Sequence, residues 1–230
     1  MSNIAIIPAR SGSKGLKDKN IKELKGIPLI AYSIKCAIGS GMFDSVFVST
    51  DSKEYAKVAE EYGADAHFLR SKKNSSDTAG SWDVVREVLE QFEKEGKVFD
   101  NIMLLQPTSP LRTKEDIINS FKMMKTKNAN AIVSVTEMEH SPLWCNTLPE
   151  NLSMEEFFND KAINTPRQGL PTYYRLNGAI YLLKRKELQK EKMFRDGCYA
   201  YIMSNERSVD IDKNWDFKLA EIYLEVESED

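Results

Sequence analysis

The sequence is poor in the residues that build disulfides, zinc sites and covalent nucleophiles. Its three cysteines, Cys36, Cys145 and Cys198, are odd in number, lie far apart and include no CxxC pair. This spacing argues against both a disulfide framework and a zinc site. The two histidines, His67 and His140, belong to no Ser/His/Asp or Cys/His pattern, so nothing in the sequence supports a covalent nucleophile.

Long apolar runs and a large net charge are also absent. No stretch approaches the length of a membrane span, and the chain reaches a charged loop after only a few apolar residues, unlike a signal peptide. A formal charge of -3 and a pI near 5.6 argue against a nucleic-acid-binding surface. We therefore expect a reduced, cytoplasmic protein with no membrane or nucleic-acid partner. Its 230 residues are enough for one large domain with a small insertion.

Strand and helix patterns alternate through residues 1–136. The runs Ile4–Ile7 and Ile102–Leu105 are continuously apolar, as expected for strands of a sheet that is covered on both faces. Further strands are expected at 45–49, 66–69 and 131–135, and helices at 29–38, 54–62, 82–95 and from a capping box at 113–116 onward. This order predicts an α/β fold with a mostly parallel, doubly wound sheet.

The alternation stops between residues 137 and 174. Prolines punctuate this segment, at positions 142, 149, 166 and 171. We interpret residues 137–174 as a small inserted segment, either a β-rich flap or a dimerisation arm, within a catalytic domain formed by residues 1–136 and 175–230. Strand patterns resume at 179–183 and 199–203, and a closing helix is expected at 215–226.

A small basic loop follows the first expected strand. A proline ends the strand, and residues 10–20 then combine glycine and serine with Arg10, Lys14, Lys17 and Lys19. Such loops hold phosphates in α/β proteins. The loop is not a Walker A motif, because no Gly-Lys-Ser/Thr follows a glycine at the required spacing. It is either a phosphate site, with Arg10, Lys14 and Lys19 on phosphate oxygens, or an ordinary solvated turn.

Two aspartates stand close together near the end of the chain, in Val209-Asp210-Ile211-Asp212. On a strand, Asp210 and Asp212 would project from one face while the two apolar residues face the core. Two carboxylates on one face can share a hard cation such as Mg²⁺, which takes oxygen ligands and keeps several waters. The alternative is a pair of surface aspartates before a helix, one of which caps it.

Two further segments are candidates for substrate binding. Residues 106–112 contain two prolines and follow an apolar strand, which suits a loop that holds a base or a sugar and, equally, a rigid connector with a helix cap. Arg167 and Arg175 lie in or beside the inserted segment; arginine suits bidentate carboxylate recognition, and an unpartnered surface position is the alternative. Ligands of open parallel sheets bind outside the carboxyl ends of the strands. Four polar clusters are expected to meet there, namely the loop 10–20, Thr50-Asp51, residues 106–112 and the Asp210 region.

Together these stretches resemble the CMP-N-acetylneuraminate synthetases, the acylneuraminate cytidylyltransferases that activate nine-carbon sialic acids. The matching motifs occur in the family's order and span nearly the whole chain. They are Ile7–Gly15, Lys19-Asn20, Val48–Asp51, Ser76–Thr78, Leu105–Arg112, Pro166–Gln168, Asn177–Tyr181 and Asp210–Asp212. The CMP-Kdo synthetases share the overall plan but lack the Ser-Gly-Ser-Lys-Gly loop in this form.

The resemblance implies a Rossmann-like nucleotidyltransferase, and a homodimer whose inserted segment reaches toward the partner's active site. It implies transfer of CMP from CTP to the anomeric hydroxyl of N-acetylneuraminate, a nine-carbon sugar acid, with release of pyrophosphate. Catalytic roles are implied for Arg10, Lys14 and Lys19, which would hold the triphosphate, and for Asp212, which with Asp210 would bind Mg²⁺. Substrate contacts are implied for Asn20, Arg70, Ser81, Gln106, Arg167, Arg175 and Tyr181.

Two alternatives remain open on the sequence. One is the same reaction on legionaminic, pseudaminic or Kdo-type acids, because Trp144 stands where some family members have a lysine. The other is a non-catalytic nucleotide or sugar sensor. The basic set in the first loop and the aspartate pair argue against a sensor, since decayed sites usually lose such groups.

Overall fold

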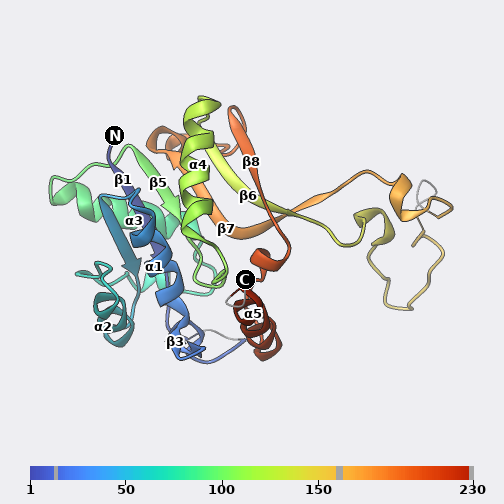
Figure 1. The fold of residues 1–230 in the computed structure, drawn as a ribbon, viewed down its shortest axis with the longest axis horizontal. Helices are drawn as coiled ribbons and strands as arrows, with labels where there is room; N and C mark the ends of the chain where they lie inside the picture. The colour runs from blue at the N-terminus through green and yellow to red at the C-terminus, as the bar shows by residue number, and fades with distance from the viewer. Residues whose placement is uncertain (13–14, 159–162, 228–230) are drawn as a thin grey trace.

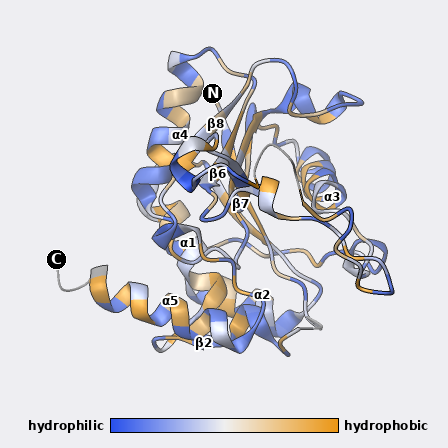
Figure 2. Ribbon diagram, turned by 90° about the vertical axis from the view of Figure 1, so that its right-hand side faces the viewer, coloured by the Kyte–Doolittle hydropathy of each residue, from blue (hydrophilic) through white to orange (hydrophobic). Residues whose placement is uncertain are grey.

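A mixed sheet of six strands forms the centre of the computed structural model, which describes residues 1–12, 15–158 and 163–227. The strand order is β4-β1-β5-β7-β6-β8. The strands are β1 (Asn3–Pro8), β4 (Ser45–Ser49), β5 (Asn101–Leu104), β6 (Ala131–Glu137), β7 (Tyr174–Lys184) and β8 (Cys198–Met203). Figure 2 shows that the middle of this sheet is mostly hydrophobic, as the apolar runs of β1 and β5 require.

Strand β7 runs against both of its neighbours, β5 and β6. The other pairings, of β1 with β4 and β5 and of β6 with β8, are parallel. The described residues between β6 and β7 include only short 3-10 helices, η3 (Pro142–Trp144) and η4 (Arg167–Gly169). Parallel neighbours are usually joined by a crossover helix, so the lack of a longer helix in this described segment agrees with the antiparallel return of the chain. The expected mostly parallel sheet is thus confirmed with one reversed strand.

Helices cover both faces of the sheet (Figure 1). On one face lie α1 (Leu29–Ser40), α2 (Lys53–Glu61) and α4 (Lys114–Thr126), which share a core with Ala5 and Ile7 of β1. On the other face lies α3 (Ser81–Lys94), whose apolar stripe packs against Ile4 and Ile6. Successive residues of β1 therefore serve opposite layers, as the alternation of side chains along a strand demands.

A third apolar cluster lies beside the carboxyl edge of the sheet. It joins α5 (Asn214–Glu227) to a small hairpin of β2 (Glu23–Leu24) and β3 (Ile27–Pro28). The two hairpin strands are linked by Lys25 and Gly26, which have φ of 50° and 74°. Positive φ at both central residues is typical of tight hairpin turns. The sequence did not predict this hairpin, because its strands are too short to give an alternating pattern.

Two segments that were expected as strands are not strands. Residues 66–69 follow an isolated bridge between Phe47 and Asp65 and form no ladder. Ala66 is buried and the ring of Phe68 stacks on that of Phe47 at 4.4 Å, whereas Leu69 is exposed. Residues 209–212 lie beyond β8, after η6 (Glu206–Ser208), where no described strand pairs with them. Burial nevertheless alternates there as expected, with Val209 and Ile211 buried and both aspartates exposed.

The segment between β6 and β7 extends away from the sheet (Figure 1). Its described part exposes large apolar side chains, namely Trp144, Leu148, Leu152, Met154, Phe158 and Ile163. Exposed apolar groups gathered in this way are typical of interaction surfaces. The division of the chain into a catalytic domain and an inserted segment stays a prediction. None of the described helices is long and apolar enough to cross a membrane.

The imidazole of His67 lies between two carboxylates, at the end of α3 that is remote from Ser81. Its Nδ1 is 2.6 Å from Oδ1 of Asp65, and its Nε2 is 2.7 Å from Oε1 of Glu95. Burial of the ring opposes its charge, but the hydrogen bonds and charges of Glu95 and Asp65 prevail and raise the pKa of His67.

A raised pKa in the fold means that protonated His67 stabilises the protein below its unfolded pKa, and that this stabilisation is lost as the pH rises through the folded pKa. We therefore expect His67→Gln to lower the free energy of unfolding more at pH about 6 than at pH about 9. Denaturant unfolding at the two pH values measures this, with His140→Gln as a control. An equal loss at both pH values would contradict a charged His67.

Candidate active site

A cavity of about 510 Å³ opens at the carboxyl edge of the parallel strands. Residues from segments far apart in the chain line it, among them the predicted site residues Arg10, Lys19, Asn20, Arg70, Ser81, Gln106 and Asp212. They follow β1 and β5, begin α3 and precede α5. The fold thus brings these side chains to the edge where open α/β sheets bind ligands.

Other predicted residues lie elsewhere. Asp210 and Arg175 line a neighbouring cavity of about 460 Å³ between the base of the inserted segment and α5. Arg167 is exposed on η4 of the inserted segment, and the ring of Tyr181 packs edge-on against that of Trp82 at 6.0 Å. Neither is among the described residues that line the first cavity. Lys14 falls outside the described residues.

The first loop is held by polar contacts on both sides. A guanidinium nitrogen of Arg10 lies 2.8 Å from Oδ1 of Asp77, and Asn20 donates to the carbonyl oxygen of Arg10 at 3.0 Å. Ser11 donates through its backbone N–H and its hydroxyl to the carboxylate of Asp51, at 2.7 and 3.0 Å. Asp51, which follows β4, therefore anchors the loop after β1, and this fixes the position of Arg10 at the mouth of the cavity.

Lys19 joins the first loop to the aspartates near the end of the chain. Its Nζ lies 2.9 Å from Oδ1 of Asp212 and donates to the carbonyl oxygen of Ile211 at 2.6 Å. A Cβ on Gly15 would lie only 3.0 Å from the backbone oxygen of Asp212, so the loop can approach this closely because residue 15 is glycine. A cation and a carboxylate are thus held together within the cavity.

Arg70 forms part of the cavity wall and is almost fully buried. Its guanidinium donates to the hydroxyl of Ser49 at 3.0 Å and to the Ser49 carbonyl oxygen. Burial lowers the pKa of Arg70 to about 10, and the nearby charges of Asp51 and Glu87 oppose this shift. The side chain remains cationic at neutral pH and can serve a ligand anion from a fixed position.

A bulge in β7 brings Gly178 against the side chain of Gln106, a contact that was not predicted from the sequence. Opposite Ser134 of β6, β7 carries residues 177–180, so that the register shifts between Val133 and Val135. Gly178 has φ of 76°, and a Cβ placed there would lie 2.7 Å from Oε1 of Gln106. The isolated glycine within a strand pattern was the available signal, because such glycines mark bulges and close approaches.

Arg112 ends the proline-containing stretch but lies outside the cavity wall, buried beneath it. It donates to the carbonyl oxygens of Ser109 and Ala179, at 3.2 and 3.1 Å, and to the hydroxyl of Ser33 at 2.6 Å. The structure therefore shows the stretch as a connector that also lines the cavity, and its binding of a base or a sugar stays a prediction. Its first residues line the cavity, and its last one ties α1 and β7 to the loop.

The family of the chain follows from comparison with known proteins. The family model described as "Cytidylyltransferase" matches residues 4–221. The chain belongs to the cytidylyltransferase family. It is therefore a nucleotidyltransferase, and the resemblance seen in its motifs is confirmed at the level of the family.

Curated relatives of this cytidylyltransferase carry several names. It is 36% identical over 233 residues to the CMP-N,N'-diacetyllegionaminic acid synthase of Legionella pneumophila, with 100% of this chain and 99% of that protein covered. It is 38% identical over 219 residues to the N-acylneuraminate cytidylyltransferase of Escherichia coli, with 94% of this chain covered but only 51% of the relative. The pseudaminic acid cytidylyltransferase of Campylobacter jejuni is 33% identical over 230 residues, with 100% and 99% covered.

Solved structures support the fold. A CMP:2-keto-3-deoxy-manno-octonic acid synthetase complexed with CTP matches with a TM-score of 0.73 at 16% identity, and the match covers 99% of this chain and 100% of that one. At 16% identity this match supports only the fold of the chain.

The aspartate pair fits a divalent cation of the kind that cytidylyltransferases generally need. Although Asp210 is exposed to solvent on one side, partial desolvation of its carboxylate raises its pKa, the charge of Asp212 raises it further, and a hydrogen bond from Thr108 opposes both. The described residues contain no cluster of three or more His, Cys, Asp or Glu side chains suited to a metal. This donor set suits Mg²⁺, which is commonly bound by one or two carboxylates plus water and substrate phosphates.

Proposed function

We propose that the protein transfers CMP from CTP to the anomeric hydroxyl of a nine-carbon sugar acid of the sialic type, with release of pyrophosphate. The observation that carries this proposal is the convergence of Arg10, Lys19 and Arg70 with Asp212 and Gln106 in one cavity at the carboxyl edge of the sheet. Three cations match a triphosphate, and an amide beside them can hydrogen-bond a base or a sugar.

In this proposal the basic residues of the first loop, Arg10, Lys14 and Lys19, hold the triphosphate. Asn20, Arg70, Ser81 and Gln106 contact the nucleotide and the sugar acid, and Arg175 and Tyr181 complete the sugar side. These side chains act by holding both reactants in line and by neutralising charge, which is how most of the barrier to phosphoryl-type transfer is lowered.

The reaction is a substitution at the α-phosphorus of CTP. The anomeric oxygen forms a bond to this phosphorus, the bond to the oxygen that bridges to the β-phosphate breaks, and pyrophosphate leaves. The proton of the anomeric hydroxyl is lost to the surroundings. Asp210 and Asp212 would hold Mg²⁺, which when bound neutralises phosphate charge and lowers the pKa of a coordinated hydroxyl.

The sugar acid is a matter for experiment, with two leading candidates. N-acetylneuraminate is the acid that the motifs indicate, and the N-acylneuraminate cytidylyltransferase of E. coli matches over 94% of this chain. N,N'-diacetyllegionaminic acid is favoured by the relative from L. pneumophila, which matches over its whole length. The presence of Trp144 in place of a lysine also argues for testing acids other than N-acetylneuraminate.

A panel assay tests this proposal. Pyrophosphate release is measured with CTP and Mg²⁺ and, in turn, N-acetylneuraminate, N,N'-diacetyllegionaminate, pseudaminate and Kdo. We expect release with at least one nine-carbon acid and a clear ranking of kcat/KM among the four. No release with any acid, while CTP still binds, would favour a nucleotide sensor.

We further propose that the inserted segment, residues 137–174, forms a homodimer in which Arg167 serves the partner's site. The exposed apolar side chains of this segment support an interface, and exposed Arg167 does not line the cavity of its own chain. Arg167→Met and Asp212→Asn should each be inactive alone. Mixed dimers of the two variants would carry one intact site, so mixing should restore activity. Failure to restore it in a proven mixed dimer would contradict the shared site.

A further inference from the structure

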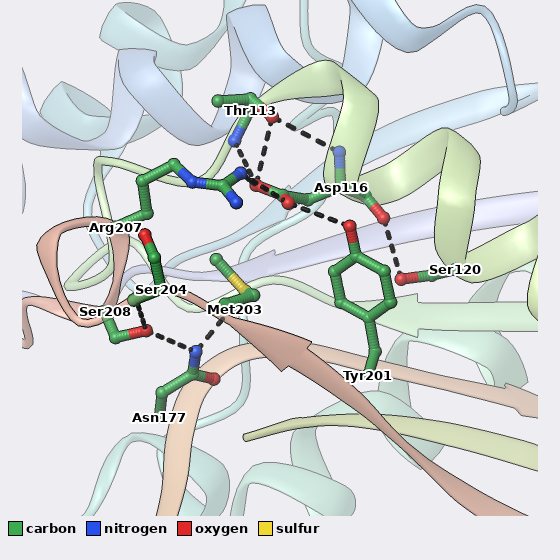
Figure 3. A network of polar contacts seen from close by, with 9 residues as sticks. All are labelled: Thr113, Asp116, Ser120, Asn177, Tyr201, Met203, Ser204, Arg207 and Ser208. Atoms are coloured by element: carbon green, nitrogen blue, oxygen red, sulfur yellow. Dashed lines mark hydrogen bonds and ion pairs between the residues drawn. The ribbon is translucent and has the colours of Figure 1, made fainter. Parts of the chain in front are cut away.

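We infer that Arg207, through its ion pair with Asp116, is a positioning residue for the stretch that carries Asp210 and Asp212. The inference rests on the cation-binding role proposed for these two aspartates. It assigns a function to a buried polar network outside the cavity, which Figure 3 shows from close by.

The centre of the network is the carboxylate of Asp116, in the first turn of α4, whose side chain is 1% exposed. It accepts hydrogen bonds from the backbone N–H and the hydroxyl of Thr113, at 2.9 and 3.0 Å, and from the hydroxyl of Tyr201 at 3.0 Å. A guanidinium nitrogen of Arg207 lies 2.6 and 2.7 Å from its two oxygens. Arg207 thus supplies the positive charge in direct contact with a buried carboxylate, and a buried carboxylate that loses its cation is strongly destabilised.

The same network reaches the start of the aspartate stretch. Arg207 belongs to η6, which ends at Ser208, the residue before Val209. The hydroxyl of Ser208 donates to the carbonyl oxygen of Ser204 at 2.6 Å and accepts from Asn177 at 2.9 Å (Figure 3). η6 is therefore fixed to α4 by Arg207 and to the bulge of β7 by Ser208.

Residues 209–212 need such anchors because no described strand pairs with them. The backbone N–H of Ile211 donates to the carbonyl oxygen of Thr108 at 2.8 Å, and Lys19 donates to the carbonyl oxygen of Ile211. At the far end, Asp216 accepts from the backbone N–H groups of Asp212 and Lys213, at 2.9 and 2.7 Å. At the opposite end, the Arg207–Asp116 pair and the hydrogen bonds of Ser208 anchor η6, so loss of the pair would remove one of the two supports from which the stretch begins.

The pair also couples two parts of the site. Helix α4 directly follows the stretch 106–112, so Asp116 joins the loop that carries Gln106 to the segment that carries the aspartates. Partners that orient metal ligands without touching the metal typically change metal affinity or activity by about 10- to 100-fold when they are removed. Arg207 is such a partner, because it helps to orient Asp210 and Asp212 without contacting the proposed metal.

The test measures binding of Mn²⁺, a paramagnetic substitute for Mg²⁺, in the presence of CTP by water proton relaxation. We expect Arg207→Met to weaken Mn²⁺ binding about tenfold, and Arg207→Lys to weaken it less because a positive charge remains. Metal-free CTP in EDTA should bind all variants equally, since Arg207 is not among the described residues of the cavity wall. Circular dichroism shows whether each variant is folded. If Arg207→Met does not fold, the comparison is made with Arg207→Lys alone.

Arg185→Met is the matched control. Arg185 pairs with Glu93 near the other end of β7, and its side chain is 26% exposed compared with 29% for Arg207. The Arg185→Met variant should bind Mn²⁺ with the affinity of the wild type. If the Arg207 variants bind Mn²⁺ as tightly as the wild type and lose only thermal stability, the pair is structural and the inference is wrong. If the wild type itself binds no Mn²⁺ beyond that held by CTP, the proposed metal role fails, and the inference fails with it.

Discussion

Asp212→Asn is expected to abolish turnover while leaving the fold intact. The side chain of Asp212 is 70% exposed and lines the cavity, so its replacement by an isosteric amide removes charge without disturbing the core. A cation site built on two carboxylates would lose half of its protein charge. We expect kcat at saturating Mg²⁺ to fall by at least about 100-fold. Removal of residues that only orient metal ligands already lowers metal affinity or activity by about 10- to 100-fold.

The matched control for this change is Asp196→Asn, at an exposed aspartate on the loop before β8. It has the same chemistry but lies outside the cavity wall, so turnover should match the wild type. Thermal unfolding should give similar midpoints for the wild type and both variants. Turnover like that of the wild type in Asp212→Asn would remove the metal role from this residue.

Gly178→Ala is expected to reduce turnover strongly although residue 178 bears no functional group. A Cβ at this position would lie 2.7 Å from Oε1 of Gln106, so the amide has to move. Displacement of a positioning group by about 1 Å can cost about 100-fold in rate, and we expect kcat/KM for both substrates to fall by this order. The left-handed backbone also disfavours alanine by about 1–2 kcal/mol.

Gly96→Ala separates these two effects. Gly96 has φ of 79°, close to the 76° of Gly178, but a Cβ there would meet no described atom within 4 Å. Gly96→Ala should lose only the backbone part of the free energy of unfolding, about 1–2 kcal/mol, and should keep normal turnover. If Gly178→Ala is as active as Gly96→Ala, the position of Gln106 does not control the reaction.

The elements that could be predicted from the sequence are those whose pattern is local. The apolar run of β1 and the stripe of α3 are buried as expected, and the capping box at Thr113 and Asp116 is present. Alternation of burial along 209–212 was also foreseen, although the stretch is not a strand. In each of these cases neighbouring residues alone determine which side chains are buried.

What the sequence could not reveal depends on contacts between distant segments. Residues 66–69 resemble a strand in sequence, but the described strands do not include them, and the ring of Phe68 stacks on that of Phe47. In residues 106–112, the first residues, among them Gln106, line the cavity, whereas Arg112 is buried outside its wall, and only the fold distinguishes them. The bulge of β7 likewise depends on Ser134, which is 43 residues away from Asn177 in the chain.

The most direct test of the account follows the products of a single reaction. The wild-type protein is incubated with CTP, Mg²⁺ and an equal mixture of N-acetylneuraminate, N,N'-diacetyllegionaminate and pseudaminate, and the CMP-sugars and pyrophosphate are quantified by mass spectrometry and a coupled assay. The proposed function predicts a CMP-linked nine-carbon acid and pyrophosphate in equal amounts, with neither formed when the acids are omitted. Pyrophosphate without a CMP-sugar, or neither product while CTP remains bound, would contradict it.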